Sequence, residues 1–280
     1  MSDVLIEPGE LHRWLEEGQA VTILDCRTRL NDREAGRRLW QEGRIPGSRH
    51  LDLDRDMAST PGERGRHPLP SPKHFTTTLQ RLGVDEQTPV VVYDDCGGQL
   101  AAARAWWMLA CWANHPRVSV LDGGLDAWRE EGFALNDQAI PVKSSDWQPE
   151  FDPGAWVDAD QVASSSTLKL DVRGPERFSG DREPMDPKAG HIPGALNRPG
   201  GENLRQDGRF KSPEVLADEL SNLHQGSGIG QDSIVYCGSG VAACHTILAC
   251  AVAGKPLPKL YVGSWSEWSQ RPERGIATGD

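Results

Sequence analysis

The stretch Ser233-Ile234-Val235-Tyr236-Cys237-Gly238-Ser239-Gly240-Val241-Ala242-Ala243 joins a short apolar run, a thiol and a glycine-rich turn. The apolar run predicts a buried strand that ends at Cys237, and the residues after it predict a turn that opens a helix. Backbone N–H groups at a helix N-terminus attract an anion, and glycine lets the chain wrap closely around the sulfur. The stretch therefore indicates a reactive thiolate, with a small buried cysteine at a strand end as the alternative.

The strand that precedes Cys237 belongs to one of four motifs that occur twice, in the same order. The two copies of each motif lie between 140 and 147 residues apart, which is too long a period for a solenoid repeat. The pairs are Leu24-Asp25-Cys26-Arg27 with Leu170-Asp171-Val172-Arg173, Gly43-Arg44-Ile45-Pro46-Gly47 with Gly190-His191-Ile192-Pro193-Gly194, Val91-Val92-Tyr93 with Ile234-Val235-Tyr236, and Leu121-Asp122-Gly123-Gly124 with Tyr261-Val262-Gly263-Ser264. The chain is therefore predicted to contain two tandem copies of one domain.

In both halves, short apolar runs alternate with helical patterns such as the one over residues 100–113. The runs are Val21–Leu24, Val90–Tyr93 and Val118–Leu121 in the first half, and Leu168–Leu170, Ile234–Tyr236 and Leu260–Val262 in the second. This alternation predicts an α/β fold in which each domain is a parallel sheet flanked by helices on both faces. We expect domain 1 to span residues 1–139, a proline-rich linker to span 140–154, and domain 2 to span 155–280.

The net charge, the cysteine spacing and the lengths of the apolar runs limit which partners and which cellular compartment we expect. The 280 residues carry a net charge of −11, which argues against a nucleic acid or an anionic membrane as partner. Six cysteines form no Cys-x-x-Cys pair and no zinc spacing, so we expect no metal. The N-terminus lacks the pattern of a signal peptide, and no apolar run is long enough for a membrane span. A cytoplasmic protein is expected.

The paired motifs and the Cys237–Ala243 loop make the family recognisable. Over essentially its full length the chain resembles the two-domain rhodanese-like sulfurtransferases, and its loop is similar to that of 3-mercaptopyruvate sulfurtransferases. The resemblance implies a ping-pong reaction without a cofactor: the Cys237 thiolate takes a sulfur atom from a donor, becomes a persulfide, and passes that sulfur to an acceptor. The expected acceptor is cyanide or a thiol, with a thioredoxin-like protein as one candidate.

The two copies are not chemically equivalent. Aligning Tyr93 with Tyr236 places Asp94 at the position of Cys237, so domain 1 is expected to be non-catalytic. Cys96 lies two residues further on, but repulsion from Asp94 and Asp95 would raise the pKa of its thiol and make it a poor nucleophile. The Asp-x-Arg motifs recur in the active and the inactive copy alike, which indicates a structural role for them.

The resemblance also implies a group that assists Cys237. In mercaptopyruvate sulfurtransferases, a serine of this loop works with an aspartate and a histidine from the other domain. Ser239 matches the serine, Asp54 the aspartate and His67 the histidine, with Asp52 as the near alternative to Asp54. The alternative role of Ser239 is a helix N-cap, where serine is common.

The donor is expected to be a small anion. Arg177 matches a family arginine that binds it, and an ion pair of Arg177 with Glu176 or Asp181 is the alternative. The backbone of Gly238, Gly240, Val241 and Ala242 is expected to complete the substrate cradle. Two departures from the family are visible: Ala242 stands where a threonine is usual, and residues 183–188 lack a second substrate arginine.

Three functions remain open from the sequence. Gly238 and Ser239 are uncharged, which favours 3-mercaptopyruvate over the dianion thiosulfate as donor. A thiosulfate sulfurtransferase on the same scaffold is the second candidate. A rhodanese-like sulfur carrier that acts with a partner protein is the third, and it would also need Cys237.

Overall fold

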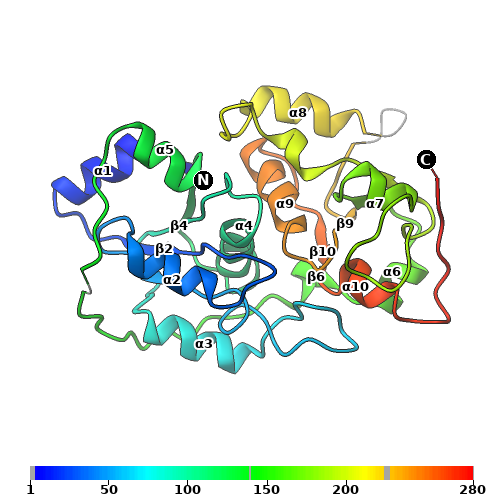
Figure 1. Ribbon diagram of the computed structural model, residues 1–280, viewed down its shortest axis with the longest axis horizontal. Helices are drawn as coiled ribbons and strands as arrows, with labels where there is room; N and C mark the ends of the chain where they lie inside the picture. Colours follow the sequence, from blue (N-terminus) through cyan, green and yellow to red (C-terminus); the bar gives the residue numbers. More distant parts are fainter. Residues whose placement is uncertain (1–3, 139, 224–227, 280) are drawn as a thin grey trace. The chain divides into compact units, whose positions relative to one another are not determined.

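The computed structural model describes residues 4–138, 140–223 and 228–279, and the chain divides into two compact units (Figure 1). Unit 1 contains Met1–Ala58, Pro70–Asp152 and Gln206–Phe210, and unit 2 contains Ser59–Leu69, Pro153–Arg205 and Lys211–Asp280. Each unit is built on its own five-stranded sheet. The predicted α/β fold of two tandem copies is confirmed.

The first sheet has the strand order β1-β5-β4-β2-β3, and every pair of neighbours is parallel. Its strands are β1 (Leu5–Ile6), β2 (Thr22–Asp25), β3 (Arg49–His50), β4 (Val90–Tyr93) and β5 (Val118–Leu121). The helices of this half are α1 (Pro8–Glu16), α2 (Ala35–Glu42), α3 (Pro72–Arg81), α4 (Ala101–Trp106) and α5 (Gly124–Glu130). Every residue of β2 and β4 is buried, as expected for central parallel strands covered on both faces.

The second sheet repeats this order as β6-β10-β9-β7-β8, again with parallel pairs. Its strands are β6 (Trp156–Val157), β7 (Lys169–Asp171), β8 (Ala195–Asn197), β9 (Ile234–Tyr236) and β10 (Lys259–Tyr261). The helices are α6 (Ala159–Ser164), α7 (Pro175–Ser179), α8 (Pro213–Ser221), α9 (Ala243–Val252) and α10 (Ser264–Trp268), with short 3₁₀ turns at Pro153–Ala155 and Gly200–Asn203. The same strand order in both sheets is what the duplicated motifs predict.

The helix predicted over residues 100–113 has two parts. It begins as α4 and continues from Trp107 to Trp112 as a π-helix, in which each turn holds an extra residue. Most side chains of both parts are buried. The apolar pattern therefore predicted the helix correctly, but it does not encode the change of hydrogen-bond register.

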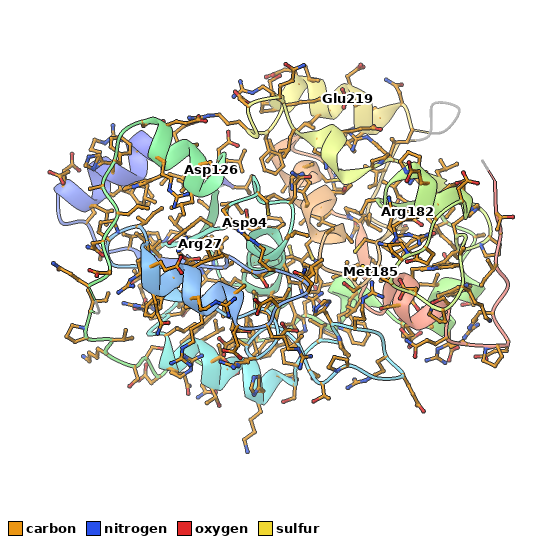
Figure 2. All side chains as sticks on the ribbon, viewed as in Figure 1. Arg27, Asp94, Asp126, Arg182, Met185 and Glu219 are labelled. Carbon is orange, nitrogen blue, oxygen red and sulfur yellow. The ribbon has the colours of Figure 1, made fainter. Side chains whose placement is uncertain are left out.

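Each Asp-x-Arg motif forms a buried ion pair at the carboxyl end of a central strand. Arg27, the arginine of the first pair, is labelled in Figure 2. The Arg27 guanidinium donates to both carboxylate oxygens of Asp25, and Arg173 makes the same bonds to Asp171, each with a shortest distance of 2.6 Å. The Tyr93 hydroxyl also donates to Asp25 at 2.6 Å. Burial and repetition support the structural role predicted for these pairs.

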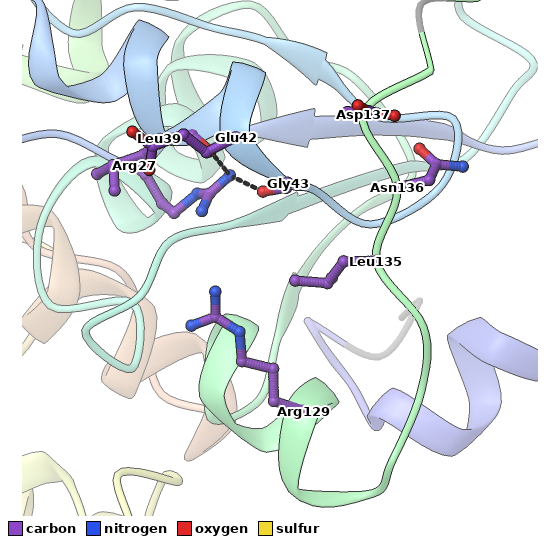
Figure 3. A pocket seen from close by; sticks show the side chains of 8 residues that line it. All are labelled: Arg27, Leu39, Glu42, Gly43, Arg129, Leu135, Asn136 and Asp137. Atoms are coloured by element: carbon purple, nitrogen blue, oxygen red, sulfur yellow. Dashed lines mark hydrogen bonds between the residues drawn. The ribbon is translucent and has the colours of Figure 1, made fainter.

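The chain between the Asp-x-Arg and Ile-Pro-Gly motifs differs between the copies. In unit 1 it forms α2, and Arg27 donates to the carbonyl oxygens of Leu39 and Gly43 at the C-terminal end of that helix (Figure 3). A cation at this end also complements the helix dipole. These residues line a cavity of about 320 Å³. In unit 2 the corresponding chain forms only the short α7 and then a loop over residues 180–190, so its side chains are available for other contacts.

Residues 59–69 lie in the first half of the sequence but pack within unit 2. The backbone N–H of Arg66 donates to Ser266 Oγ at 3.1 Å. A Cβ on Gly65 would lie 2.7 Å from the carbonyl oxygen of Gly263, and Gly65 has φ of 93°, so only glycine fits there. This segment therefore delivers two sequence neighbours, Arg66 and His67, to the second sheet.

Candidate active site

Cys237 follows β9 directly, and α9 begins six residues later at Ala243. The cysteine is 3% exposed. Its backbone N–H donates to Ser264 Oγ at 3.2 Å, and its carbonyl oxygen accepts from the N–H of Trp265 at 3.0 Å. The turn into α10 thus holds the backbone of the cysteine in place, and the predicted strand, turn and helix around Cys237 are all present.

Gly240 lets the loop lie directly against the end of β10. Its φ is 73°, and a Cβ there would lie 2.3 Å from the carbonyl oxygen of Val262. A side chain at this position would meet the backbone itself, which cannot move aside without distorting the strand end. The positive φ and the close approach to Val262 therefore require glycine at position 240.

The equivalent loop of unit 1 shows what such a turn binds. The buried Asp94 carboxylate accepts hydrogen bonds from the backbone N–H groups of Cys96 at 3.1 Å, Gly98 at 2.8 Å and Ala102 at 3.2 Å. The loop after β4 therefore surrounds an anion that is attached to its own first residue. By analogy, the loop after β9 is suited to an anionic sulfur on Cys237.

Ser239 and His67 form a hydrogen-bonded pair within unit 2. Ser239 Oγ lies 2.8 Å from His67 Nδ1, and both residues are buried. The N-cap position of α9 is Ala242, so Ser239 does not have the alternative role of capping that helix. A hydroxyl two residues from the thiol, bonded to an imidazole, can move a proton to or from a bound donor.

Asp54 lies in unit 1, where its carboxylate is 3.6 Å from Arg33 Nε. Burial raises the pKa of Asp54, although Arg33 opposes this. Asp52 accepts hydrogen bonds from the N–H groups of Asp54 and Arg55 within its own turn. Burial opposes ionisation of Asp52, but His50 and these N–H groups outweigh it and lower its pKa. Asp52 is therefore occupied locally, and a role for Asp54 beside Ser239 and His67 stays a prediction.

Arg177 belongs to a group of four charged side chains, which we call the arginine clamp: Arg66, Arg177, Glu183 and Asp186. Arg177 donates to Glu183 at 2.7 to 3.1 Å and to Asp186 at 3.1 Å. Arg66 forms an ion pair with the other oxygen of Asp186. The alternative pairing of Arg177 with Glu176 or Asp181 is therefore wrong, because its carboxylate partners are Glu183 and Asp186.

The clamp lies against the backbone next to Cys237. A Cβ on Gly238 would be 2.9 Å from Arg66 Nη2 and 3.2 Å from Arg177 Nη1. Two guanidinium groups therefore reach the residue that follows the thiol. Arg66 was missed from the sequence because its partners are 120 residues or more away; the only local signal was its position immediately before His67.

Three of the remaining cysteines, Cys26, Cys96 and Cys250, are poor nucleophiles. Burial, and then repulsion from Asp94, raises the pKa of Cys96, in the direction expected from its neighbours. Burial also raises the pKa of Cys26, and it raises that of Cys250 to about 12. Cys244 Sγ lies 3.4 Å from the carbonyl oxygen of Gly240.

In the part of the chain that the structure describes, no group of three or more His, Cys, Asp or Glu side chains could hold a metal ion. No helix there is long and apolar enough to cross a bilayer.

Comparison with known families identifies both halves. The rhodanese-like domain matches residues 7–131 and again residues 156–271. The chain belongs to the rhodanese-like family. Two rhodanese-like domains in tandem are therefore established, as the paired motifs predicted.

Individual members of the family resemble the whole chain. A Pseudomonas aeruginosa protein named "Probable 3-mercaptopyruvate sulfurtransferase" is 44% identical over 92% of this chain and 92% of its own length. A Mycobacterium tuberculosis protein named "Putative thiosulfate sulfurtransferase SseB" is 39% identical over 99% of this chain and 97% of its own. Among solved rhodanese-like structures, the 3-mercaptopyruvate sulfotransferase SseA from Escherichia coli matches with a TM-score of 0.78 and 31% identity, over 95% of this chain and 100% of that chain.

Proposed function

We propose that this protein is a sulfurtransferase that takes a sulfur atom from 3-mercaptopyruvate and passes it to a thiol or to cyanide through a persulfide on Cys237. The observation that carries the proposal is a single local arrangement. A buried thiol begins an anion-binding loop, a hydroxyl–imidazole pair lies two residues on, and two guanidinium groups reach the residue between them. Relatives named for this activity support it.

The first half-reaction forms the persulfide. The Cys237 thiolate attacks the donor sulfur, an S–S bond forms, and the C–S bond of the donor breaks. The electron pair of that bond leaves on the methylene carbon as the enolate of pyruvate, which must take up a proton. In the second half-reaction, an acceptor thiolate or cyanide attacks the outer sulfur and returns Cys237 to its thiolate form.

Ser239 and His67 are suited to supply the proton for the enolate. With Nδ1 protonated, His67 donates to Ser239 Oγ, and the serine hydroxyl proton is then directed to another acceptor. Transfer of that proton to the departing carbon would draw a replacement from His67. A positioned acid of this kind contributes about 10²- to 10⁴-fold to a rate.

The charge around Gly238 favours a monoanionic donor. The two guanidinium groups of the clamp are matched by the carboxylates of Glu183 and Asp186, so the clamp has no formal excess of positive charge. A carboxylate can share the remaining N–H donors, whereas the dianion thiosulfate gains less from a neutral cluster. Thiosulfate stays the second candidate, because one of the most similar relatives is named for it.

The acceptor and the compartment are also proposals. We propose a small thiol, cyanide or a thioredoxin-like protein as acceptor, because a buried persulfide needs an attacking group of small cross-section. We place the reaction in the cytoplasm, since all six cysteines are free thiols, as is usual in a reducing compartment.

The donor is tested by measuring kcat/KM for 3-mercaptopyruvate and for thiosulfate with one common acceptor. We expect mercaptopyruvate to be preferred by at least about tenfold, which corresponds to about 1.4 kcal/mol of transition-state stabilisation. A preference for thiosulfate would contradict the proposed donor while leaving persulfide chemistry in place. Absence of transfer from both donors would contradict the proposed function.

A further inference from the structure

The two guanidinium groups of the arginine clamp each keep one end directed at Gly238. Arg66 uses Nη1 for Asp186, and it is Nη2 that approaches Gly238. Arg177 uses Nε and Nη2 for Glu183 and Asp186, and it is Nη1 that approaches Gly238. Within the described residues, neither approaching nitrogen forms a hydrogen bond, so both retain N–H donors next to Cys237.

Asp186 holds the two guanidinium groups in a fixed relation. One of its oxygens pairs with Arg66 and the other with Arg177, so a single carboxylate bridges them. Its side chain is 3% exposed. Glu183 adds a second anchor, because it accepts from Arg177 and also from Arg173 Nη1 at 3.2 Å. Buried anchors leave the guanidinium groups little freedom, which is the condition for binding a ligand without a large loss of side-chain entropy.

We propose that Arg66 is a second donor-binding residue, and that Arg66 and Arg177 together bind the carboxylate of a 2-oxo acid donor. The inference rests on the proposed function and names the part of the donor that the clamp recognises. In mercaptopyruvate, two carbon atoms separate the carboxylate carbon from the sulfur. The clamp lies at the residue next to Cys237, so a carboxylate held there leaves the sulfur at the thiol. Asp186 is then a positioning residue.

This arrangement accounts for the arginine that the 183–188 stretch lacks. Met185 is 48% exposed, and Arg182 lies 3.9 Å from Glu176 on the surface, so neither replaces it (Figure 2). The second cation comes instead from residue 66, more than a hundred positions earlier. Its unpaired, buried Nε is a further sign that this guanidinium is not fully satisfied by the protein.

The test measures how strongly each variant discriminates between mercaptopyruvate and its uncharged amide, 3-mercapto-2-oxopropanamide, in a single turnover that forms the persulfide. We expect Arg66→Ala to lower kcat/KM for mercaptopyruvate about 10- to 100-fold, as for loss of a hydrogen bond between charged groups. For the amide the loss should be much smaller, so the preference for the carboxylate should fall by fivefold or more.

The controls separate binding from folding and from bulk charge. Arg64→Ala removes an exposed positive charge from the same segment, and its preference for the carboxylate should equal that of the wild type. Arg66→Gln keeps an N–H donor for Asp186 and is used in place of Arg66→Ala if the alanine variant does not fold. Its preference for the carboxylate over the amide is also expected to fall by fivefold or more. Gly238→Ala should weaken carboxylate preference with little change in melting temperature, because the added methyl group meets the ends of the two guanidinium groups and no backbone atom.

The outcomes distinguish this inference from the proposed function. A wild-type protein that takes no sulfur from mercaptopyruvate contradicts the proposed donor, on which this inference rests, and that is seen before any variant is made. An active wild type whose carboxylate preference falls by less than fivefold in both Arg66 variants overturns the inference alone. Such a result would exclude Arg66 from binding the donor carboxylate.

Discussion

The loops after β4 and β9 start from equivalent strands and lead into equivalent helices, but they hold different groups. The first encloses the Asp94 carboxylate with three backbone N–H groups. The second begins with Cys237. A thiol can carry a sulfur atom as a persulfide, whereas a carboxylate cannot. The comparison teaches that the fold supplies an anion-binding turn in both copies, and that one side chain decides whether the turn is chemically active.

A second difference lies between the Asp-x-Arg and Ile-Pro-Gly motifs. In unit 1 that chain is α2, and the buried arginine donates to the end of the helix. In unit 2 it is the short α7 followed by a loop, and Glu183 of that loop joins Arg173 to the arginine clamp. The same structural ion pair is therefore isolated in one copy and connected to the donor-binding residues in the other.

The largest effect is expected from exchanging the first residue of the two loops. Cys237→Ser should abolish sulfur transfer from every donor and leave the fold intact. Adding Asp94→Cys to this variant should restore no more than about 1% of wild-type turnover, because unit 1 has α2 in place of the 180–190 loop and so lacks the clamp. The measurement is steady-state turnover, together with intact mass after addition of donor.

The mass measurement gives a sharp check on this comparison. The wild type should gain one sulfur atom per chain, which a thiol removes, and the Cys237→Ser variant should gain none. Cys96→Ser is the matched control and should behave as the wild type. Two sulfur atoms on the wild type, or full activity in the exchanged protein, would show that the copies are chemically closer than their loops indicate.

A smaller, selective effect is expected at the two structural arginines. Arg27→Lys and Arg173→Lys each keep the charge but lose the planar fork, so each should lower the free energy of unfolding by about 2 kcal/mol. Only Arg173→Lys should also raise KM for mercaptopyruvate, by about threefold to tenfold, because Glu183 loses one of its partners. Equal KM values in the two variants would show that the clamp does not depend on Arg173.

The smallest effect concerns the pH dependence of stability at Asp94. Burial raises the pKa of this carboxyl group in the folded state, in spite of the N–H groups that favour its ionised form. Its contribution to stability is therefore fully present below the ordinary pKa of an aspartate and is lost as pH rises through the raised value. The melting temperature of the wild type minus that of Asp94→Asn should decrease between about pH 4 and pH 7. A difference that grows over this range would contradict the sign of the shift.

Much of the fold could be predicted because its signals are local. Four-residue strands such as Val90–Tyr93 and Val118–Leu121 were located to the residue, since buried parallel strands are continuous apolar runs bounded by polar residues. The tandem domains followed from motifs such as Gly-x-Ile-Pro-Gly that recur in order. The thiol loop was visible for the same reason: its glycines, its serine and its cysteine are adjacent in the sequence.

The clamp could not be predicted in the same way, because its contacts join distant positions. Arg66 and Asp186 are 120 residues apart, and the sequence around each residue contains no signal that the two form an ion pair. His67 was proposed only through resemblance to a family, and the contact with Ser239 spans 172 residues. The boundaries expected from the proline-rich linker also gave no sign that residues 59–69 pack with the second half. Pairings of this kind follow from tertiary packing, which a local pattern does not contain.

The place of residues 59–69 in unit 2 has a consequence for the order in which a newly synthesised chain becomes competent. At roughly 5–20 residues per second, a ribosome would deliver Ser239 roughly 10 to 30 s after His67. During that interval the Cys237 loop, which Arg66 and His67 contact in the folded protein, has not been synthesised. Bringing residues so far apart in the chain together costs conformational entropy, which only the completed second sheet can offset. The reactive thiol therefore gains its clamp and its proton donor among the last events of synthesis, and a chain that stops short of the second sheet has neither.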